Sequence, residues 1–221
     1  MASENQAYGL DIDPASISRP DRYKLVCGLV IPRPIALVTT LSSSGVINAA
    51  PFSFFNIFSE EPPVVALGLN SNANGSVKDT TRNIRDSGEF VVHLVSDEIA
   101  EQMCLCAIDF PEDISEVGIA KFRLVASRSV APPTILDAPV ALECKLLSIT
   151  ALSPTRDLAL GQIVRVKSHA GIVDTERWRV NISAHRPVGR LMGNSYVRMG
   201  EVFEMKRLTY QEWRDRNDQV A

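Results

Sequence analysis

The feature that most constrains this fold is an uncharged stretch of the chain at residues 34–59. The stretch is long enough to cross a bilayer as a helix, but the Ser-Ser-Ser-Gly turn at 42–45 and the Asn-Ala-Ala-Pro segment at 48–51 would leave backbone groups unpaired in lipid. Residues 35–41 are apolar and rich in β-branched side chains, and a second apolar run at 46–56 follows the turn. We therefore predict two buried strands joined as a β-hairpin.

Turn residues divide the rest of the chain into short segments of strand and helix character. Helices are expected at 19–28, 77–87 and 96–108. Further strands are expected at 64–70 and 89–95, and within 122–127, 139–152, 158–174 and 201–208. Many strands with few helices predict a mainly β fold with flanking helices. An antiparallel barrel fits this pattern, and the early hairpin favours a closed sheet over a doubly wound one.

Composition narrows the class of protein. The chain has 23 Lys and Arg against 26 Asp and Glu residues, a net charge of −3, so it lacks the broad basic face that nucleic-acid binding needs. Residues 1–16 are acidic without an apolar run, so we expect no signal peptide, no membrane segment and a cytoplasmic location. The length of 221 residues suits one domain at 19–210, between an N-terminal arm at 1–18 and a C-terminal tail at 211–221.

A loop that leads into a helix suggests an anion site. Ser76, as the expected N-cap, would join Lys78 and Thr80 around the free amides of the first helical turn, an arrangement that binds phosphate. The same residues are typical of ordinary helix capping, and the loop has no Walker glycine pattern. Asp79 would repel phosphate, so both direct ligand contact and a structural role through capping or pairing with Arg82 stay open.

The segment at 48–53 suggests a surface for a flat ring. Ala49 and Ala50 are small, and Ser53 adds one hydroxyl group. Pro51 cannot donate to a sheet ladder, so its strand must be an edge, a bulge or a bent strand end there. Backbone groups can then approach a heteroaromatic ring that rests on apolar strands, although each of these residues also suits a purely structural role. One ligand with a phosphate at one end and a planar redox ring at the other would use both places.

Four blocks of the sequence resemble the flavin reductase-like, FMN-binding split-barrel family, in particular its flavoredoxin-type branch. The blocks are RPIALVTTLSSSGVINAAPFSFFN at 33–56, PPVVALGLN at 62–70, KDTTRNIRDSGEFVVHLV at 78–95 and GRLMGNSY at 189–196. The resemblance implies a six-stranded antiparallel split β-barrel with flanking helices. It also implies a homodimer with one FMN per subunit near the dimer interface.

The same resemblance assigns residues to the two ends of FMN. Within the first block, Thr39, Thr40 and the backbone at 48–53 would line the isoalloxazine ring and the ribityl chain, with Ser53 near the ring and residues 33–34 beside the flavin. Residues of the third block would hold the phosphate. With Ser76 from the loop, the expected cofactor residues are Arg33, Pro34, Thr39, Thr40, Asn48, Ala50, Pro51, Phe52, Ser53, Ser76, Lys78, Asp79, Thr80 and Asn83.

One stretch departs from the family pattern. Direct NAD(P)H:flavin reductases of the family share a Gly-Asp-His motif just before a late strand. The corresponding stretch here is TRDLALGQ at 155–162, which keeps the Asp and a following Gly but has no His. The resemblance therefore leaves open whether NADH or NADPH reduces the flavin directly.

Candidate catalytic residues lie in the last third of the chain. His169 and His185 are placed to reach a flavin or a substrate near the barrel mouth, whereas His93 is expected to be structural within its strand. Tyr196 either stacks on the ring or binds substrate, with a core or interface role as the alternative. The three histidines show no ligand spacing, and the four cysteines no C-x-x-C spacing, so we expect no metal site and reduced thiols.

These patterns lead to the hypothesis of an FMN-dependent oxidoreductase. Its simplest form is an NAD(P)H-linked, flavin reductase-like enzyme that passes electrons through bound FMN to an acceptor or a partner monooxygenase. The alternatives are a non-catalytic FMN-binding electron carrier, an FMN-dependent oxygenase that acts on an organic substrate, and a split-barrel protein that has lost its flavin. A carrier would bind FMN without turning over NAD(P)H.

Overall fold

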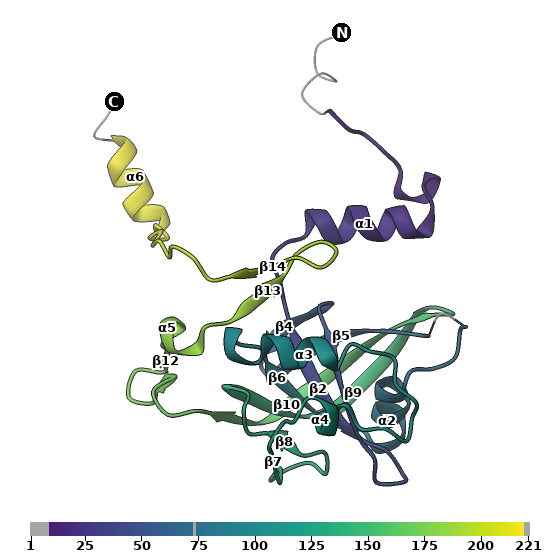
Figure 1. The fold of residues 1–221 in the computed structure, drawn as a ribbon. Coiled ribbons are helices and arrows are strands. Elements are labelled where there is room, and N and C mark those ends of the chain that lie inside the picture. Colours follow the sequence, from purple (N-terminus) through teal and green to yellow (C-terminus); the bar gives the residue numbers. More distant parts are fainter. Residues whose placement is uncertain (1–8, 73, 219–221) are drawn as a thin grey trace.

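The computed structural model describes residues 9–72 and 74–218, which form a mainly β fold with peripheral helices (Figure 1). The helices are α1 (Arg19–Leu29), α2 (Asp79–Ser87), α3 (Ala100–Leu105), α4 (Glu116–Ile119), α5 (Ile182–His185) and α6 (Tyr210–Asp218), with short 3-10 turns η1 (Pro14–Ser16) and η2 (Asp97–Ile99). The strands are β1 (Arg33–Pro34), β2 (Ala36–Leu41), β3 (Ile47–Phe52), β4 (Phe55–Glu60), β5 (Pro63–Asn70), β6 (Glu89–Leu94), β7 (Leu124–Val125), β8 (Thr134–Ile135), β9 (Val140–Ser153), β10 (Arg156–Ser168), β11 (Val173–Asp174), β12 (Arg179–Val180), β13 (Val188–Arg190) and β14 (Tyr196–Arg198).

Seven antiparallel strands form the main sheet in the order β3-β2-β6-β9-β10-β5-β4. The predicted hairpin is confirmed, because β2 pairs with β3 with Ala36 opposite Phe52 and Leu41 opposite Ile47. The apolar run at 46–56, expected as one strand, forms both β3 and β4. The main sheet therefore has seven strands where six were expected.

The two edge strands of this sheet are neighbours in the chain. Only Ser53 and Phe54 separate the end of β3 from the start of β4, so the sheet must curl until its two edges approach each other. Within the described residues no ladder joins β3 to β4, so the curled sheet stays open along this line and is not the closed sheet that we expected. Pro51 lies in edge strand β3, which is one of the three positions that its missing N–H allows.

The two faces of the curled sheet bury two apolar clusters. Val38 and Phe90 belong to one cluster, whereas Leu37, the neighbour of Val38 in β2, belongs to the other together with Met103 of α3. Burial of each large apolar side chain stabilises the folded state by roughly 1.5–3 kcal/mol. Gly161 of β10 is required for this packing, since a Cβ there would lie 2.3 Å from Cζ of Phe90.

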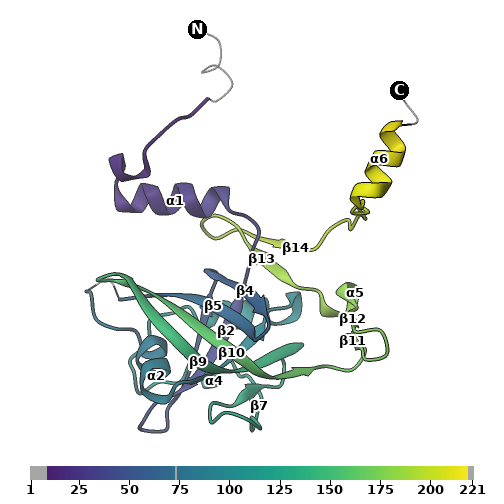
Figure 2. The ribbon, with the colours of Figure 1, turned by 180° about the vertical axis from the view of Figure 1, so that it is seen from behind.

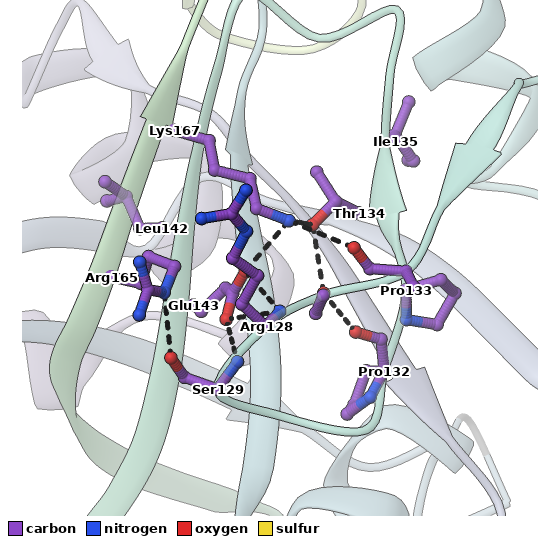
Figure 3. Close-up of polar contacts among 12 residues, drawn as sticks. Arg128, Ser129, Pro132, Pro133, Thr134, Ile135, Leu142, Glu143, Arg165 and Lys167 are labelled. Atoms are coloured by element: carbon purple, nitrogen blue, oxygen red, sulfur yellow. Dashed lines mark hydrogen bonds and ion pairs between the residues drawn. The ribbon is translucent and has the colours of Figure 1, made fainter.

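A buried carboxylate ties the loop before β8 to the sheet (Figure 3). Glu143 of β9 accepts hydrogen bonds from the backbone N–H groups of Arg128 at 3.0 Å and Ser129 at 2.6 Å. Nζ of Lys167 lies 2.9 Å from Oε1 of Glu143 and also donates to Oγ1 of Thr134 at 3.0 Å. Burial alone would raise the pKa of Glu143, but these partners outweigh it and hold that pKa below its ordinary value.

The elements α1, α6 and the β13–β14 hairpin lie on the same side of the curled sheet (Figures 1 and 2). Helix α1 lies beside the hairpin, whereas α6 stands apart from both α1 and the sheet. The expected strand at 201–208 is wrong, because this segment has no regular structure. Its Phe203 and Met205 side chains are 76% and 83% exposed. The expected tail at 211–221 is helical from Tyr210 as far as the structure describes it, and residues 1–8 of the expected N-terminal arm lie outside the described part.

The other helices differ modestly from expectation. Gly88 ends α2 in the left-handed conformation with φ of 68°, as its position predicted. The helix expected at 96–108 is shorter, because η2 precedes an α3 that ends at Leu105. In the described residues, no helix is long and apolar enough to cross a membrane.

Candidate functional site

A cleft of about 590 Å³ opens where the two edges of the sheet approach each other. Its walls come from β3, the Ser53 and Phe54 link, the end of β5, the loop into α2, the segment after α3 and the β13–β14 hairpin. Gly68 of β5 lets the link lie close, since a Cβ there would be 2.8 Å from Cβ of Phe54. The curled sheet therefore builds the cleft from segments far apart in the sequence.

One end of the cleft is polar and lies at the start of α2. Lys78 is the N-cap residue, and its Nζ lies 2.9 Å from Asp109 across the cleft wall. Asn48 of β3 donates a hydrogen bond to Oγ1 of Thr80 at 2.8 Å, which fixes the helix start against the edge strand. The first amides of α2 have no partner within the helix, so this end combines backbone N–H groups with one cation and suits an anion.

Asp79 has a structural partner at this end of the cleft. Its Oδ1 lies 2.6 Å from Arg82, which is the structural pairing that the sequence left open beside direct ligand contact. The prediction that Ser76 is the N-cap is wrong, because α2 begins at Asp79. Ser76 instead donates to Oδ1 of Asn74 at 2.7 Å and stabilises the preceding loop.

The other end of the cleft is less polar and follows the edge of the sheet. Ala50, Phe52 and Phe54 line it, together with Met103 and Ile35 from the cluster behind. This end offers a surface on which a planar ring can rest. Because Pro51 has no N–H, the edge strand offers few donors here.

Arg33 does not line the cleft but holds together the segments next to this edge of the sheet. The side chain is 6% exposed, and its guanidinium donates to the backbone oxygens of Cys27, Val30 and Leu191. Its Nε also lies 3.4 Å from Oγ of Ser53. Arg33 therefore joins the end of α1, the hairpin loop and the turn between the sheet edges.

The β13–β14 hairpin forms the rim of the cleft. The guanidinium of Arg190 lies 4.4 Å from the ring centroid of Tyr196, a cation–π contact. The hydroxyl of Tyr196 lies 3.4 Å from Sγ of Cys104, and burial together with this contact raises the pKa of Tyr196. The rim thus presents one cation and one phenol to whatever occupies the cleft.

Glu116, the first residue of α4, is a cleft residue that the sequence patterns did not reveal. Its carboxylate accepts a hydrogen bond from the N–H of Ala49 at 2.9 Å, on the open edge of β3. Burial raises the pKa of Glu116, and nearby Asp79 adds to this effect. Burial likewise raises the pKa of the neighbouring Cys106 to about 12, with a contribution from Glu116.

The structure divides the sequence-predicted residues into two groups. Those that line the cleft are Asn48, Ala50, Pro51, Phe52, Ser53, Lys78, Asp79, Thr80 and Tyr196. Those that do not line it are Arg33, Pro34, Thr39, Thr40, Ser76, Asn83, His169 and His185. Thr39 is buried and donates to the oxygen of Pro133 at 2.7 Å, whereas Thr40 accepts a hydrogen bond from Asn83 at 3.0 Å, so both support the strand from outside the cleft.

The histidines lie away from the cleft. His169 and His185 line a separate cavity of about 150 Å³ beside Ser96, so this chain does not bring them to the barrel mouth as we expected. His93 is structural as predicted, because its ring bonds the oxygen of Leu37 at 2.9 Å and the N–H of Ile135 at 2.8 Å. Burial lowers the pKa of His93 to about 4, which keeps the ring neutral.

The stretch that lacks the Gly-Asp-His histidine is part of β10. Asp157 pairs there with Arg85 of α2 at 2.7 Å, and Gly161 accommodates Phe90. Both residues therefore have structural roles in the sheet. All four cysteines are free thiols, and in residues 9–72 and 74–218 no group of three or more His, Cys, Asp or Glu side chains could hold a metal ion.

The cleft fits the ligand that the sequence resemblance implied. Its volume of about 590 Å³ lies in the usual range for cofactor sites, and its lysine and helix amides suit a phosphate. Its apolar end suits a flat ring. Fold and site together define a curled antiparallel β protein with a cleft whose polar end suits an anion and whose apolar end suits a flat ring.

Comparison with known proteins identifies the family. Residues 28–184 match the family model described as flavin reductase like domain, and the chain belongs to this family. An uncharacterized protein of Halalkalibacterium halodurans is 38% identical over 93% of this chain and 100% of its own length.

Two solved structures are similar over almost the whole chain. One is the 2-nitrobenzoate 2-nitroreductase of Pseudomonas fluorescens, with a TM-score of 0.83 and 38% identity over 91% of this chain and 98% of its own. The other is component B of the nitrilotriacetate monooxygenase of Bacillus cereus, with a TM-score of 0.84 and 34% identity over 90% of this chain and 99% of its own. The split-barrel flavin reductase fold and a flavin-related redox function follow for this chain.

Proposed function

We propose that the chain is an FMN-dependent oxidoreductase that binds FMN in the cleft between the sheet edges. The observation that carries this proposal is that one cleft contains protein groups suited to both ends of FMN. Lys78 and the first amides of α2 lie at one end, and the apolar edge around Phe52 lies at the other. When bound, FMN supplies hydride and electron transfer chemistry, while the protein binds and orients it.

Different residues of the chain would bind the two ends of FMN. Lys78 and the α2 amides hold the phosphate, with Thr80 positioned by Asn48. Ala50 and Phe52 support the ring and exclude water from one of its faces. Residues that do not line the cleft, such as Arg33 and Thr40, hold the strands that present these groups.

The electron donor in this proposal is NADH or NADPH, and the acceptor is a partner monooxygenase. The similarity to component B of the Bacillus cereus nitrilotriacetate monooxygenase supports such a partner. An alternative is that an organic substrate is reduced directly in the same cleft, as the similarity to the nitrobenzoate nitroreductase suggests. The Arg190 and Tyr196 rim favours this alternative for an anionic aromatic substrate, which a cation and a phenol would bind.

A homodimer is part of the proposal. Exposed apolar side chains follow β14, with Val202 at 60%, Phe203 at 76% and Met205 at 83% exposure. Apolar side chains exposed in one continuous segment are typical of an interface. The segment extends from the hairpin that forms the cleft rim, and its position supports an interface beside the proposed FMN site.

Anaerobic titration of the FMN-loaded protein with NADH and with NADPH tests the enzyme proposal. We expect bleaching of the flavin absorbance by one of the donors, followed by recovery when an electron acceptor is added. Bound FMN that neither donor reduces would refute an NAD(P)H-linked enzyme and leave the electron carrier. Adding 2-nitrobenzoate to the reduced protein separates direct substrate reduction from transfer to a partner.

A further inference from the structure

Glu116 occupies the junction between the open edge of β3 and the anion end of the cleft. It is 8% exposed and lines the cleft, and its Oε2 accepts the N–H of Ala49 at 2.9 Å. The preceding Ser115 donates to the oxygen of Ile47 at 2.5 Å, so both residues hold backbone groups of the edge strand. The side chain is therefore fixed in position by the fold.

The charged groups around Glu116 do not neutralise a carboxylate there. From α2, Asp79 adds negative charge near the carboxyl, and Lys78 is engaged by Asp109 at 2.9 Å. From the end of α3, Cys106 contributes a thiol that remains protonated. Strand β3 carries no charged residue, and in the described part of the chain Glu116 makes no ion pair.

A phosphate bound at Lys78 would add further negative charge to the same end of the cleft. A buried carboxylate without a cation is destabilised by each added negative charge, so its protonated form becomes favoured. The protonated carboxyl can still accept the N–H of Ala49, and it gains an O–H donor on a side chain that lines the cleft. Protonation thus converts a repulsive group into a hydrogen-bond donor.

We propose that Glu116 carries a proton whenever the cleft holds FMN, and that its protonated carboxyl is a hydrogen-bond donor of the cofactor site. This inference rests on the proposed function. The proton comes from solvent, so FMN binding takes up a proton wherever free Glu116 is ionised. Below the pKa that Glu116 has in the FMN-free protein, the affinity for FMN does not depend on this carboxyl. As pH rises above that pKa, the affinity for FMN falls.

The experiment measures FMN binding between pH 6 and 9 by isothermal titration calorimetry, in buffers of different ionisation enthalpy. Wild-type protein is compared with Glu116→Gln, which keeps an acceptor for Ala49 and carries no charge. At pH 8 the phosphate of free FMN, with a second pKa of about 6, is already a dianion and does not contribute a proton. Riboflavin, which lacks the phosphate, is the matched ligand control.

We expect wild-type protein to take up a proton on binding FMN at pH 8, and Glu116→Gln to take up none. The wild-type Kd should rise relative to that of Glu116→Gln by about tenfold for each pH unit by which the cofactor raises the carboxyl pKa. Riboflavin should show a smaller difference between the two proteins. Equal proton counts and parallel pH profiles would overturn the inference.

Failure of the proposed function has a different signature, because neither protein would then bind FMN at any pH and both proposals would fall together. If both proteins bind FMN with the same pH dependence and the same proton uptake, only the role of Glu116 is refuted. If Glu116→Gln does not fold by circular dichroism, the wild-type count at pH 8 decides alone: more protons taken up with FMN than with riboflavin support the inference, and equal counts overturn it.

Discussion

Lys78 is the residue on which anchoring of the anionic tail depends. Its ammonium group is the cation at the start of α2, and phosphate would displace Asp109 from it. We expect Lys78→Ala to weaken FMN binding by about 1.5–3 kcal/mol, the range for loss of a charge-assisted hydrogen bond, which is roughly 10- to 150-fold in Kd. Quenching of flavin fluorescence in an equilibrium titration measures this change.

Lys145→Ala is the matched control, because Lys145 is an exposed lysine of β9 that pairs with Glu89 at 3.8 Å outside the cleft. Its Kd for FMN should equal that of the wild type. An unchanged Kd in Lys78→Ala would remove Lys78 from the site.

Glu143 is a second residue whose charge matters, in this case for stability. Glu143→Gln removes the negative charge that Lys167 faces and weakens the acceptor for two backbone N–H groups, so we expect a loss of about 1–3 kcal/mol in unfolding free energy. The folded-state pKa of Glu143 is lowered, so its stabilisation is present above the unfolded pKa of about 4.3 and is lost as pH falls through the folded value.

Urea unfolding of both proteins at pH 7 and pH 4 measures this effect. The stability difference between wild type and Glu143→Gln should be largest at pH 7 and shrink toward pH 4. The exposed Glu201 provides the control variant Glu201→Gln, which should leave stability unchanged at both pH values. A difference that stays constant with pH would mean that the charge of Glu143 does not contribute.

Sequence reasoning found only part of the site at the level of residues. Lys78 and Thr80 were predictable because a cation and a hydroxyl next to a helix start have a local signature. Glu116 and Arg190 were not, since each reaches the cleft through contacts with strands far away in the sequence. The polar sequence around Glu116 is typical of a loop, and its contact with β3 is visible only in the folded structure.

At the scale of elements, local chemistry predicted the positions of strands better than their ends. The missing N–H of Pro51 predicted an edge, a bulge or a bent strand end, and β3 is an edge strand. The division of 46–56 into β3 and β4 was not predictable, because both halves are equally apolar and the break at Ser53 arises from curling of the sheet. The segment at 201–208 has strand-like composition, but it finds no strand partner within the described chain.

The proposed dimer interface lies in this segment at 201–208, where substitutions can test it. Replacing both Phe203 and Met205 by Ser removes two exposed apolar side chains from the proposed interface. We expect the dimer of the double variant to dissociate at protein concentrations at which the wild type remains dimeric, because interface affinity depends on a few buried apolar anchors. Sedimentation velocity over a concentration series measures the dissociation.

Ser substitution of the exposed Leu152, at the far end of β9, gives a control that also removes apolar surface. This control should dissociate like the wild type. A wild type that is monomeric at all concentrations would refute the dimer, and an equally stable dimer in the double variant would place the interface elsewhere.

At the scale of the whole molecule, curling of one sheet creates the site. The sheet brings its edge strands β3 and β4 together at Ser53, and the start of α2 closes one end of the resulting cleft. The sequence blocks were sufficient to indicate the family and the split-barrel fold. They could not show that Thr39, Thr40 and Asn83 support the cleft from outside, because that depends on which face of each element turns inward.

Equilibrium binding of FMN and of riboflavin to the purified wild-type protein tests the central claim most directly. If the cleft holds the ring at the sheet edge and the phosphate at the start of α2, FMN should bind at one site per chain. It should bind at least about tenfold more tightly than riboflavin, as expected for charge-assisted hydrogen bonds to the phosphate. Equal affinity for the two flavins, or no binding of either, would contradict the claim.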